Sequence, residues 1–182
     1  MNKNDELFEI VDESGKVLGV RPRRECHGNP ALIHQAVHLL VFNRRGELFL
    51  QKRALNKDVQ PGKWDSSVGG HMQPGETPLQ AVLRETEEEL GLRGATVHFA
   101  YQYLWRNLRE SELIRTYVAV SDGPFVLQVS EIDEGRFWSA AEITAHLGRD
   151  CFTPNFEFEF QKFQREGAAL LNIVLETGRK KP

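Results

Sequence analysis

The sequence has little of several features that would place a protein in a particular class. It has only two cysteines, Cys26 and Cys151, and its first residues lack the apolar stretch of a secretion signal. We therefore expect two reduced thiols and a cytoplasmic protein. No apolar run approaches the roughly 20 residues that cross a bilayer, so the sequence predicts no membrane span.

A large excess of charge of one sign is also missing. The net charge of −3 provides no basic surface that would attract a nucleic-acid polymer or an anionic membrane. With 182 residues, 40% of them apolar, the chain can bury a sizeable core. It contains no internal repeat, low-complexity segment or linker, so we expect residues 1–182 to form a single domain.

The segment 70–92 predicts a well-capped helix. Thr77 is a candidate N-cap, Pro78 suits the first helical position, and Gln80 lies where a capping box requires it. Gly91 can adopt the left-handed conformation that ends a helix. Apolar or uncharged residues at helical spacing form a stripe that should face a core: Leu79, Val82, Leu83, Thr86 and Leu90.

Three glutamates, Glu85, Glu88 and Glu89, lie within one turn of this helix and should repel one another. A divalent cation would turn this repulsion into coordination, because Mg²⁺ prefers carboxylate oxygens, water and substrate phosphates. The alternative is a solvated acidic face, which would be the better interpretation of an isolated run of glutamates. The spacing of the surrounding residues favours the metal.

From Gly70 to Leu92 the sequence reads GHMQPGETPLQAVLRETEEELGL. It resembles the Nudix box, G-x5-E-x7-R-E-U-x-E-E-x-G-U, in which U is a bulky aliphatic residue. Thr86 stands where an aliphatic residue is usual. The matching glycine and charged positions are Gly70, Glu76, Arg84, Glu85, Glu88, Glu89 and Gly91.

Strand-like segments surround this helix. We expect strands, the first two as a hairpin, in residues 7–20, 36–43, 47–53, 95–107, 113–120, 125–129 and 135–139. Helical turns are expected at 140–147 and a closing helix within 156–176. This pattern predicts an α+β protein with a mixed sheet between helices (α/β/α), an N-terminal β-hairpin and a C-terminal helix. The Nudix resemblance implies the same architecture.

The resemblance also implies a mechanism. Glu85, Glu88 and Glu89 would bind Mg²⁺ or Mn²⁺, which grips a diphosphate and activates water. Glu85 and Glu88 are both candidates for the general base, and Arg84 would orient the glutamates. Glu76 would brace the loop before the helix. The adjacent glycines Gly69 and Gly70 permit close backbone approach.

A second group of residues could bind another metal. His27 and His34 lie seven residues apart, His71 follows the two glycines, and Glu110 and Glu112 would share a face of an extended segment. Three imidazoles and two carboxylates suit Mn²⁺, Fe²⁺ or Zn²⁺. Without other information, scattered histidines are more often ordinary surface or hydrogen-bonded residues.

From Phe8 to Gly91 the chain is similar to the Nudix branch related to type I isopentenyl-diphosphate isomerase. The motifs are R-x3-H-x6-H, V-F-N-x2-G-E-L, Q-K-R-A-L-N-K, P-G-K-W and S-V-G-G-H. This resemblance implies that the three histidines and two glutamates bind one divalent metal. It also implies that Arg23, Arg53 and Lys57 contact a diphosphate, although ordinary solvated surface is the alternative for these three.

Two departures argue against isomerisation. Gly69 replaces the catalytic cysteine of the isomerases, and Asn155 replaces a tryptophan whose ring can stabilise a carbocation. The charged pairs of the Nudix box, which the isomerases disrupt, are complete. We therefore expect hydrolysis of a nucleotide-like or other organic diphosphate, with a small-molecule partner and, as is common for this fold, a homodimer as one possible state. The alternatives are an isopentenyl-diphosphate isomerase and a non-catalytic ligand-binding domain.

Overall fold

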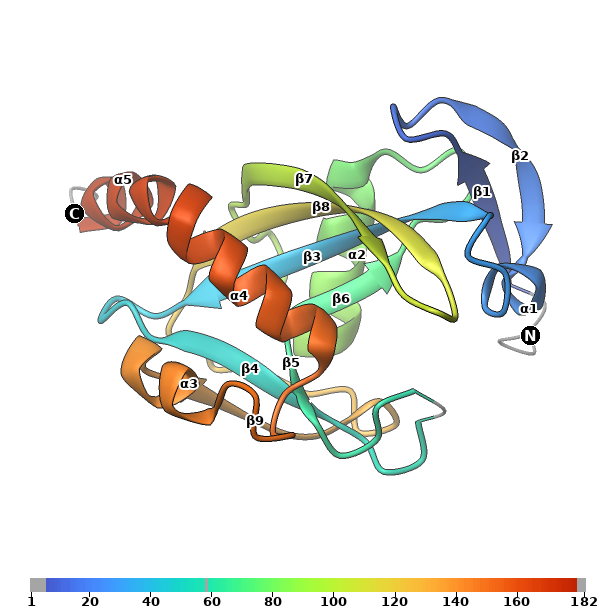
Figure 1. Ribbon diagram of the computed structural model, residues 1–182. Helices are drawn as coiled ribbons and strands as arrows, with labels where there is room; N and C mark the ends of the chain where they lie inside the picture. The colour runs from blue at the N-terminus through green and yellow to red at the C-terminus, as the bar shows by residue number, and fades with distance from the viewer. Residues whose placement is uncertain (1–5, 58, 180–182) are drawn as a thin grey trace.

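The computed structural model describes residues 6–57 and 59–179, and within them a mixed sheet lies between helices (Figure 1). The strands are β1 (Leu7–Val11), β2 (Val17–Pro22), β3 (Ile33–Phe42), β4 (Leu48–Arg53), β5 (Trp64–Asp65), β6 (Val68–His71), β7 (His98–Arg106), β8 (Ser111–Val120) and β9 (Ile132–Trp138). The helices are α1 (Arg23–Cys26), α2 (Pro78–Leu90), α3 (Ala140–His146), α4 (Pro154–Glu166) and α5 (Ala168–Arg179). The predicted α+β class and the N-terminal hairpin, formed by β1 and β2, are confirmed.

Strand β3 is the centre of the sheet. It pairs in parallel with β8 and antiparallel with β1 and β6, and all of its residues are buried. Because side chains alternate along a strand, one set belongs to a core with α2 and the other to a core with α4. Figure 1 shows α4 in front of the sheet and α2 behind it. Neighbouring residues of a strand therefore face different helices, one towards α2 and the next towards α4.

The predicted ends of α2 are confirmed. Thr77 accepts a hydrogen bond from the backbone of Gln80, the reciprocal bond completes a capping box, and Gly91 is left-handed with φ 63°. The predicted core stripe is partly wrong. Leu79 is 49% exposed, whereas Glu89 is buried, so the buried face includes a carboxylate.

The expected strand at 125–129 is absent. Instead this segment crosses the end of α2, where the amides of Val126 and Gln128 donate to the carbonyls of Leu90 and Glu89. The last carbonyls of a helix lack partners within the helix, and here they take the hydrogen bonds that a strand would have used. The short helix α1, the two-residue strand β5 and the strand β6 were not predicted.

The predicted closing helix is two helices, α4 and α5, separated at Gly167. The ring of Phe163 packs so closely that a Cβ on Gly167 would lie 2.3 Å from it. The chain can therefore pass the ring only at a glycine. Cys26 and Cys151 are free thiols, as expected. Among the described helices, none has the length and apolar character needed to span a bilayer.

We expect Thr77→Ala to lower the free energy of unfolding by about 1 kcal/mol, because the first turn of α2 would lose its cap. Urea denaturation would measure the change. Thr144→Ala is the matched control, since Thr144 lies exposed within α3 and alanine favours a helix interior. A loss no larger than that of the control would show that the cap contributes nothing.

Candidate metal and diphosphate site

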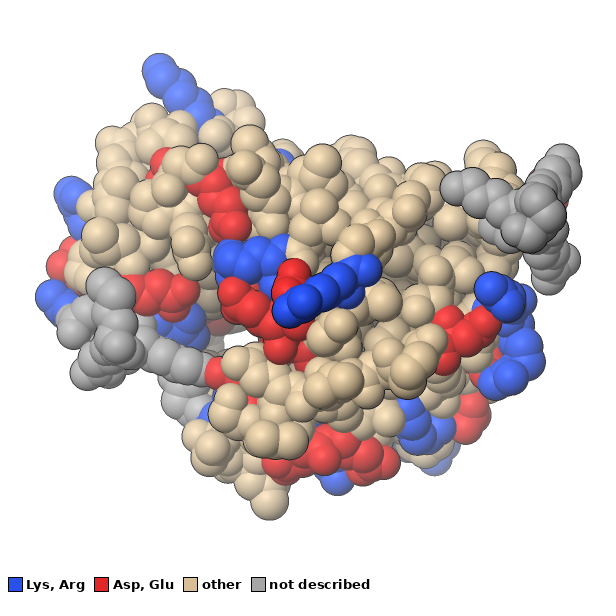
Figure 2. All heavy atoms as spheres, turned by 180° about the vertical axis from the view of Figure 1, so that it is seen from behind, with Lys and Arg blue, Asp and Glu red and all other residues tan. Residues whose placement is uncertain are grey.

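A cleft opens where the sheet divides. Strands β3 and β4 pair only at Phe42 and Leu48, so β4, β5 and β9 diverge from β6. Two cavities of about 310 and 620 Å³ adjoin there. Figure 2 shows the α2 side of the molecule, where acidic and basic side chains gather around a hollow. The residues that line both cavities are Arg23, Arg53, Lys57, Gly69, Gly70 and His71.

Successive residues of strand β6 face opposite sides of the sheet. Gly69 pairs with His38 and Gly70 with Val37, so the two glycines face opposite sides. Gly70 faces α2, and a Cβ there would lie 2.1 Å from the carboxyl carbon of Glu85. Only glycine therefore allows Glu85 to pack against the strand.

Arg84 fixes the acidic side chains around the turn before α2. Its Nε and Nη2 donate to the two carboxylate oxygens of Glu76, each at 2.9 Å. Its Nη1 donates to Glu85 at 2.7 Å, and its Nη2 also reaches the carbonyl of His71 at 3.0 Å. Glu88 lies at 3.5 Å from the same Nη1. One guanidinium thus connects the loop, the helix and β6.

Glu89 is the buried member of this acidic group. It accepts hydrogen bonds from the Gln51 side chain at 3.0 Å and from the Gly69 amide at 3.2 Å. Burial, and then the charge of Glu85, raise the pKa of Glu89 to about 8. Burial also raises the pKa of Glu85, although Arg84 opposes this. Two buried carboxyl groups whose ionisation is disfavoured fit a site for a neutralising cation.

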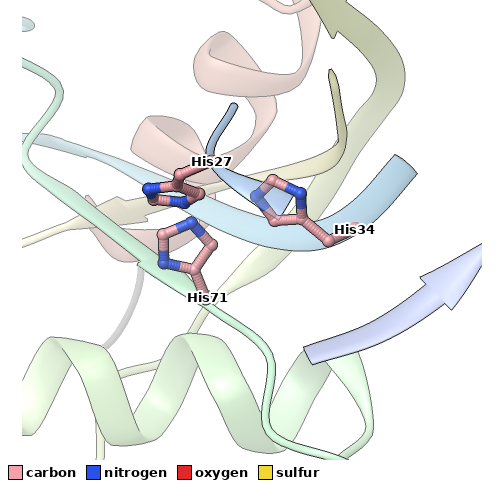
Figure 3. Close-up of side chains that lie close together, drawn as sticks. All are labelled: His27, His34 and His71. Atoms are coloured by element: carbon pink, nitrogen blue, oxygen red, sulfur yellow. The ribbon is translucent and has the colours of Figure 1, made fainter. Parts of the chain in front are cut away.

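The structure brings the five candidate ligands of the second site together. The rings of His27, His34 and His71 come from α1's C-cap, β3 and β6 and point towards one another (Figure 3). Ligand atoms of the three histidines lie within 4.8 Å of each other, as do those of His34, Glu110 and Glu112. The Nε2 atom of His27 lies 3.2 Å from Glu110, and that of His71 lies 3.3 Å from Glu112.

The chemistry of this cluster fits a divalent metal. Buried side-chain atoms of His27, His34, His71 and Glu110 have no partner with hydrogen-bond geometry within the described chain. Burial lowers the pKa of His27 to about 3 and that of His71 to about 4, so both rings are neutral at pH 7. Burial opposes the ionisation of Glu112, but the adjacent imidazoles hold its pKa well below the usual value. Neutral imidazoles beside an ionised carboxylate are the form in which these groups bind metals.

The three predicted diphosphate contacts line the cleft, and each has an acidic neighbour. Arg23 lies 3.3 Å from Glu6, and Arg53 lies 3.1 Å from Asp65. Lys57 forms an ion pair with Glu131. These pairs hold the cations at the boundary between the two cavities.

Sequence reasoning missed a buried polar pair beside the cleft, His38 of β3 and Glu159 of α4, 2.8 Å apart. Two signals were available. His38 interrupts the apolar run 36–42 of β3, and Glu159 lies between two phenylalanines of α4. A charged residue on a buried face is rare unless it is paired.

The fold and the glycine-flanked acidic helix are those of a Nudix domain, and a family model of that name matches residues 32–156. The chain belongs to the Nudix family.

Its relatives include Nudix hydrolases and isomerases. An uncharacterised Nudix hydrolase of Pseudomonas aeruginosa is 40% identical over 72% of this chain and 78% of its own length. An isopentenyl-diphosphate Δ-isomerase of Streptomyces avermitilis is 33% identical over 82% of this chain and 79% of its own. Among solved structures, DR0079 of Deinococcus radiodurans has a TM-score of 0.76 at 21% identity, covering 86% of this chain and 98% of that one.

We expect Gly70→Ala to destabilise the protein by about 1–3 kcal/mol, because the new methyl group would overlap the Glu85 carboxyl. Urea denaturation would measure the loss. Gly19→Ala is the control, since the atom nearest to its added Cβ would be 4.0 Å away. Equal stability of the two variants would show that the Glu85 carboxyl moves aside from the new methyl group without loss of free energy.

Proposed function

We propose that the protein is a metal-dependent hydrolase of an organic diphosphate. The observation that carries the proposal is the complete acidic network of α2, ordered by Arg84, facing a cleft that three cationic side chains also line. A binding domain would not need several carboxylates crowded together against their own repulsion. The free cysteines agree with a cytoplasmic enzyme.

In this proposal Glu85, Glu88 and Glu89 hold Mg²⁺ or Mn²⁺. When bound, such an ion neutralises charge on phosphoryl oxygens and lowers the pKa of water. Arg84 keeps the carboxylates in place. Glu85 and Glu88 are both candidates for accepting the proton of the attacking water. Glu88 is the less constrained of the two, because its side chain is half exposed and its distance to Arg84 is 3.5 Å, compared with 2.7 Å for Glu85.

The cationic residues would bind the diphosphate. Arg23, Arg53 and Lys57 line both cavities, so a diphosphate at their boundary would lie between the acidic helix and the smaller cavity. Guanidinium groups pair well with phosphate oxygens. The organic group would then extend into one of the two cavities.

The His/Glu cluster is proposed to hold a second divalent metal, because the buried Nε2 atoms of His27, His34 and His71 have no partner with hydrogen-bond geometry among the described residues. Its residues His27, His71, Glu110 and Glu112 also line the smaller cavity. Such an ion would supply positive charge beside the substrate or a fixed point for the surrounding loops.

A second candidate function is isomerisation of isopentenyl diphosphate, favoured by the 33% identity to isomerases and by the His/Glu cluster. Gly69 and Asn155 oppose it, because neither can supply the thiol or the aromatic face of those enzymes. Incubation with isopentenyl diphosphate separates the two reactions. Phosphate or isopentenyl phosphate indicates hydrolysis, and dimethylallyl diphosphate indicates isomerisation.

We expect the double variant Glu88→Gln, Glu89→Gln to lose at least about 100-fold in kcat/KM, because neutral amides bind Mg²⁺ poorly and cannot accept a proton. Phosphate release from a panel of nucleoside and prenyl diphosphates, with Mg²⁺ or Mn²⁺, would identify a substrate and then measure the loss.

Glu87→Gln is the matched control, since Glu87 lies on the same helix and pairs with Arg93 away from the cleft. It should keep wild-type activity. Near-normal activity of the double variant would overturn the mechanism.

We expect protein purified without chelator to contain about one equivalent of Mn, Fe or Zn at the His/Glu cluster. Removal of the metal should lower the melting temperature, because the imidazoles would lose their partner. The variant His34→Gln, His71→Gln should lack the metal, while the control His98→Gln, changed on β7, should keep it. Wild-type protein that neither contains such a metal nor gains stability from added Zn²⁺ or Mn²⁺ would refute the second site.

A further inference from the structure

The buried pair His38 and Glu159 lies outside the machinery described above. The Nδ1 atom of His38 lies 2.8 Å from a carboxylate oxygen of Glu159. Glu159 is fully buried and also accepts hydrogen bonds from the hydroxyls of Ser66, at 2.7 Å, and Thr116, at 2.6 Å. Three donors therefore hold the Glu159 carboxylate of α4 against the sheet: His38 of β3, Ser66 after β5, and Thr116 of β8.

This arrangement favours the charged form of the imidazole. Burial alone would lower the pKa of His38, but the charge and hydrogen bond of Glu159 outweigh it and raise the pKa to about 9. Burial likewise opposes ionisation of Glu159, yet its partners lower its pKa overall. At pH 7 both ring nitrogens of His38 therefore carry protons, and both are donors.

The second donor of His38 faces the cleft. A Cβ on Gly69 would lie 3.3 Å from Cδ2 and 3.5 Å from Nε2 of His38. Because Gly69 has no side chain, the ring edge lines the smaller cavity. Within residues 6–57 and 59–179, Nδ1 is the only His38 ring atom with a recorded hydrogen bond.

Asn155 adds a second donor to this cavity. Its Oδ1 accepts a hydrogen bond from the hydroxyl of Tyr103 at 3.0 Å. Burial raises the pKa of Tyr103, so that hydroxyl keeps its proton. The carbonyl end of the Asn155 amide is thereby engaged, which leaves its NH₂ group as the end available to a ligand. Trp105, which also lines the cavity, supplies an aromatic surface.

We propose that His38 donates a hydrogen bond through Nε2 to an oxygen atom of the organic group attached to the diphosphate, and so selects an oxygen-bearing group over a hydrocarbon. This inference rests on the proposed function, since it places the diphosphate at the boundary of the two cavities. Asn155 acts as the second donor. The substrate class is an organic diphosphate with sugar-like or carbonyl oxygens close to the phosphates, such as a nucleoside diphosphate.

The reason for the selection is desolvation. A hydrocarbon in the smaller cavity would remove water from the imidazolium and the amide without replacing their hydrogen bonds. A site that presents buried donors discriminates strongly against a ligand that lacks acceptors. His38 is in this respect a specificity-determining residue.

The test compares two substrates that share the diphosphate: uridine diphosphate and dimethylallyl diphosphate. The variant His38→Leu, Glu159→Leu removes both charges together, so that neither is left buried alone. We expect it to lower kcat/KM for uridine diphosphate by about 10- to 100-fold, as for a lost charge-assisted hydrogen bond, and to leave or improve that for dimethylallyl diphosphate. His98→Leu is the control. An equal fall for both substrates, or no fall for uridine diphosphate, would overturn the proposal.

A titration of the wild-type protein gives a readout that needs neither turnover nor a core substitution. In ¹⁵N-labelled protein at pH 7, the His38 ring should show two protonated nitrogens, and uridine diphosphate should shift the Nε2 resonance while dimethylallyl diphosphate should not. A neutral ring, or an Nε2 resonance that does not move, would refute the contact. Absence of hydrolysis of every diphosphate would overturn the proposed function, and the titration would still decide the role of His38.

Discussion

The arrangement of the site depends on the contacts of one guanidinium group. Arg84 binds both oxygens of Glu76, one oxygen of Glu85 and the carbonyl of His71, and thereby joins the turn, the helix and the strand that form one wall of the cleft. Its planar donor geometry suits several oxygens at fixed angles, which lysine could not provide. Without it, the carboxylates of α2 would repel one another and turn outward to solvent.

Strand β6 couples the two halves of the cleft because its side chains alternate. Gly70 accommodates Glu85 on the α2 side, whereas Gly69 leaves His38 open on the α4 side. His71, next along the strand, belongs to the His/Glu cluster. Three consecutive residues therefore set the acidic helix, the donor-lined cavity and the second candidate metal site at fixed distances from one another.

Local signals in the sequence predicted the parts of the fold that depend on local interactions. The capping box of Thr77 and the left-handed Gly91 define α2 before any tertiary contact is considered. The composition of the segment 125–129 predicts a strand, but its hydrogen bonds go to the end of α2. The acidic network was predicted from the spacing of the Nudix box, and the His/Glu cluster from the resemblance to the isomerase branch. The pairing of His38 with Glu159 joins residues 121 positions apart, which no local pattern encodes.

The most direct measurement is a crystal structure of the protein soaked with Mn²⁺ and a non-hydrolysable diphosphate analogue, with anomalous data collected for the metal. The account predicts an anomalous peak within about 2.2 Å of carboxylate oxygens from Glu85, Glu88 and Glu89, with analogue oxygens in contact with the same ion. Anomalous density confined to the His/Glu cluster, with the analogue bound away from α2, would contradict it.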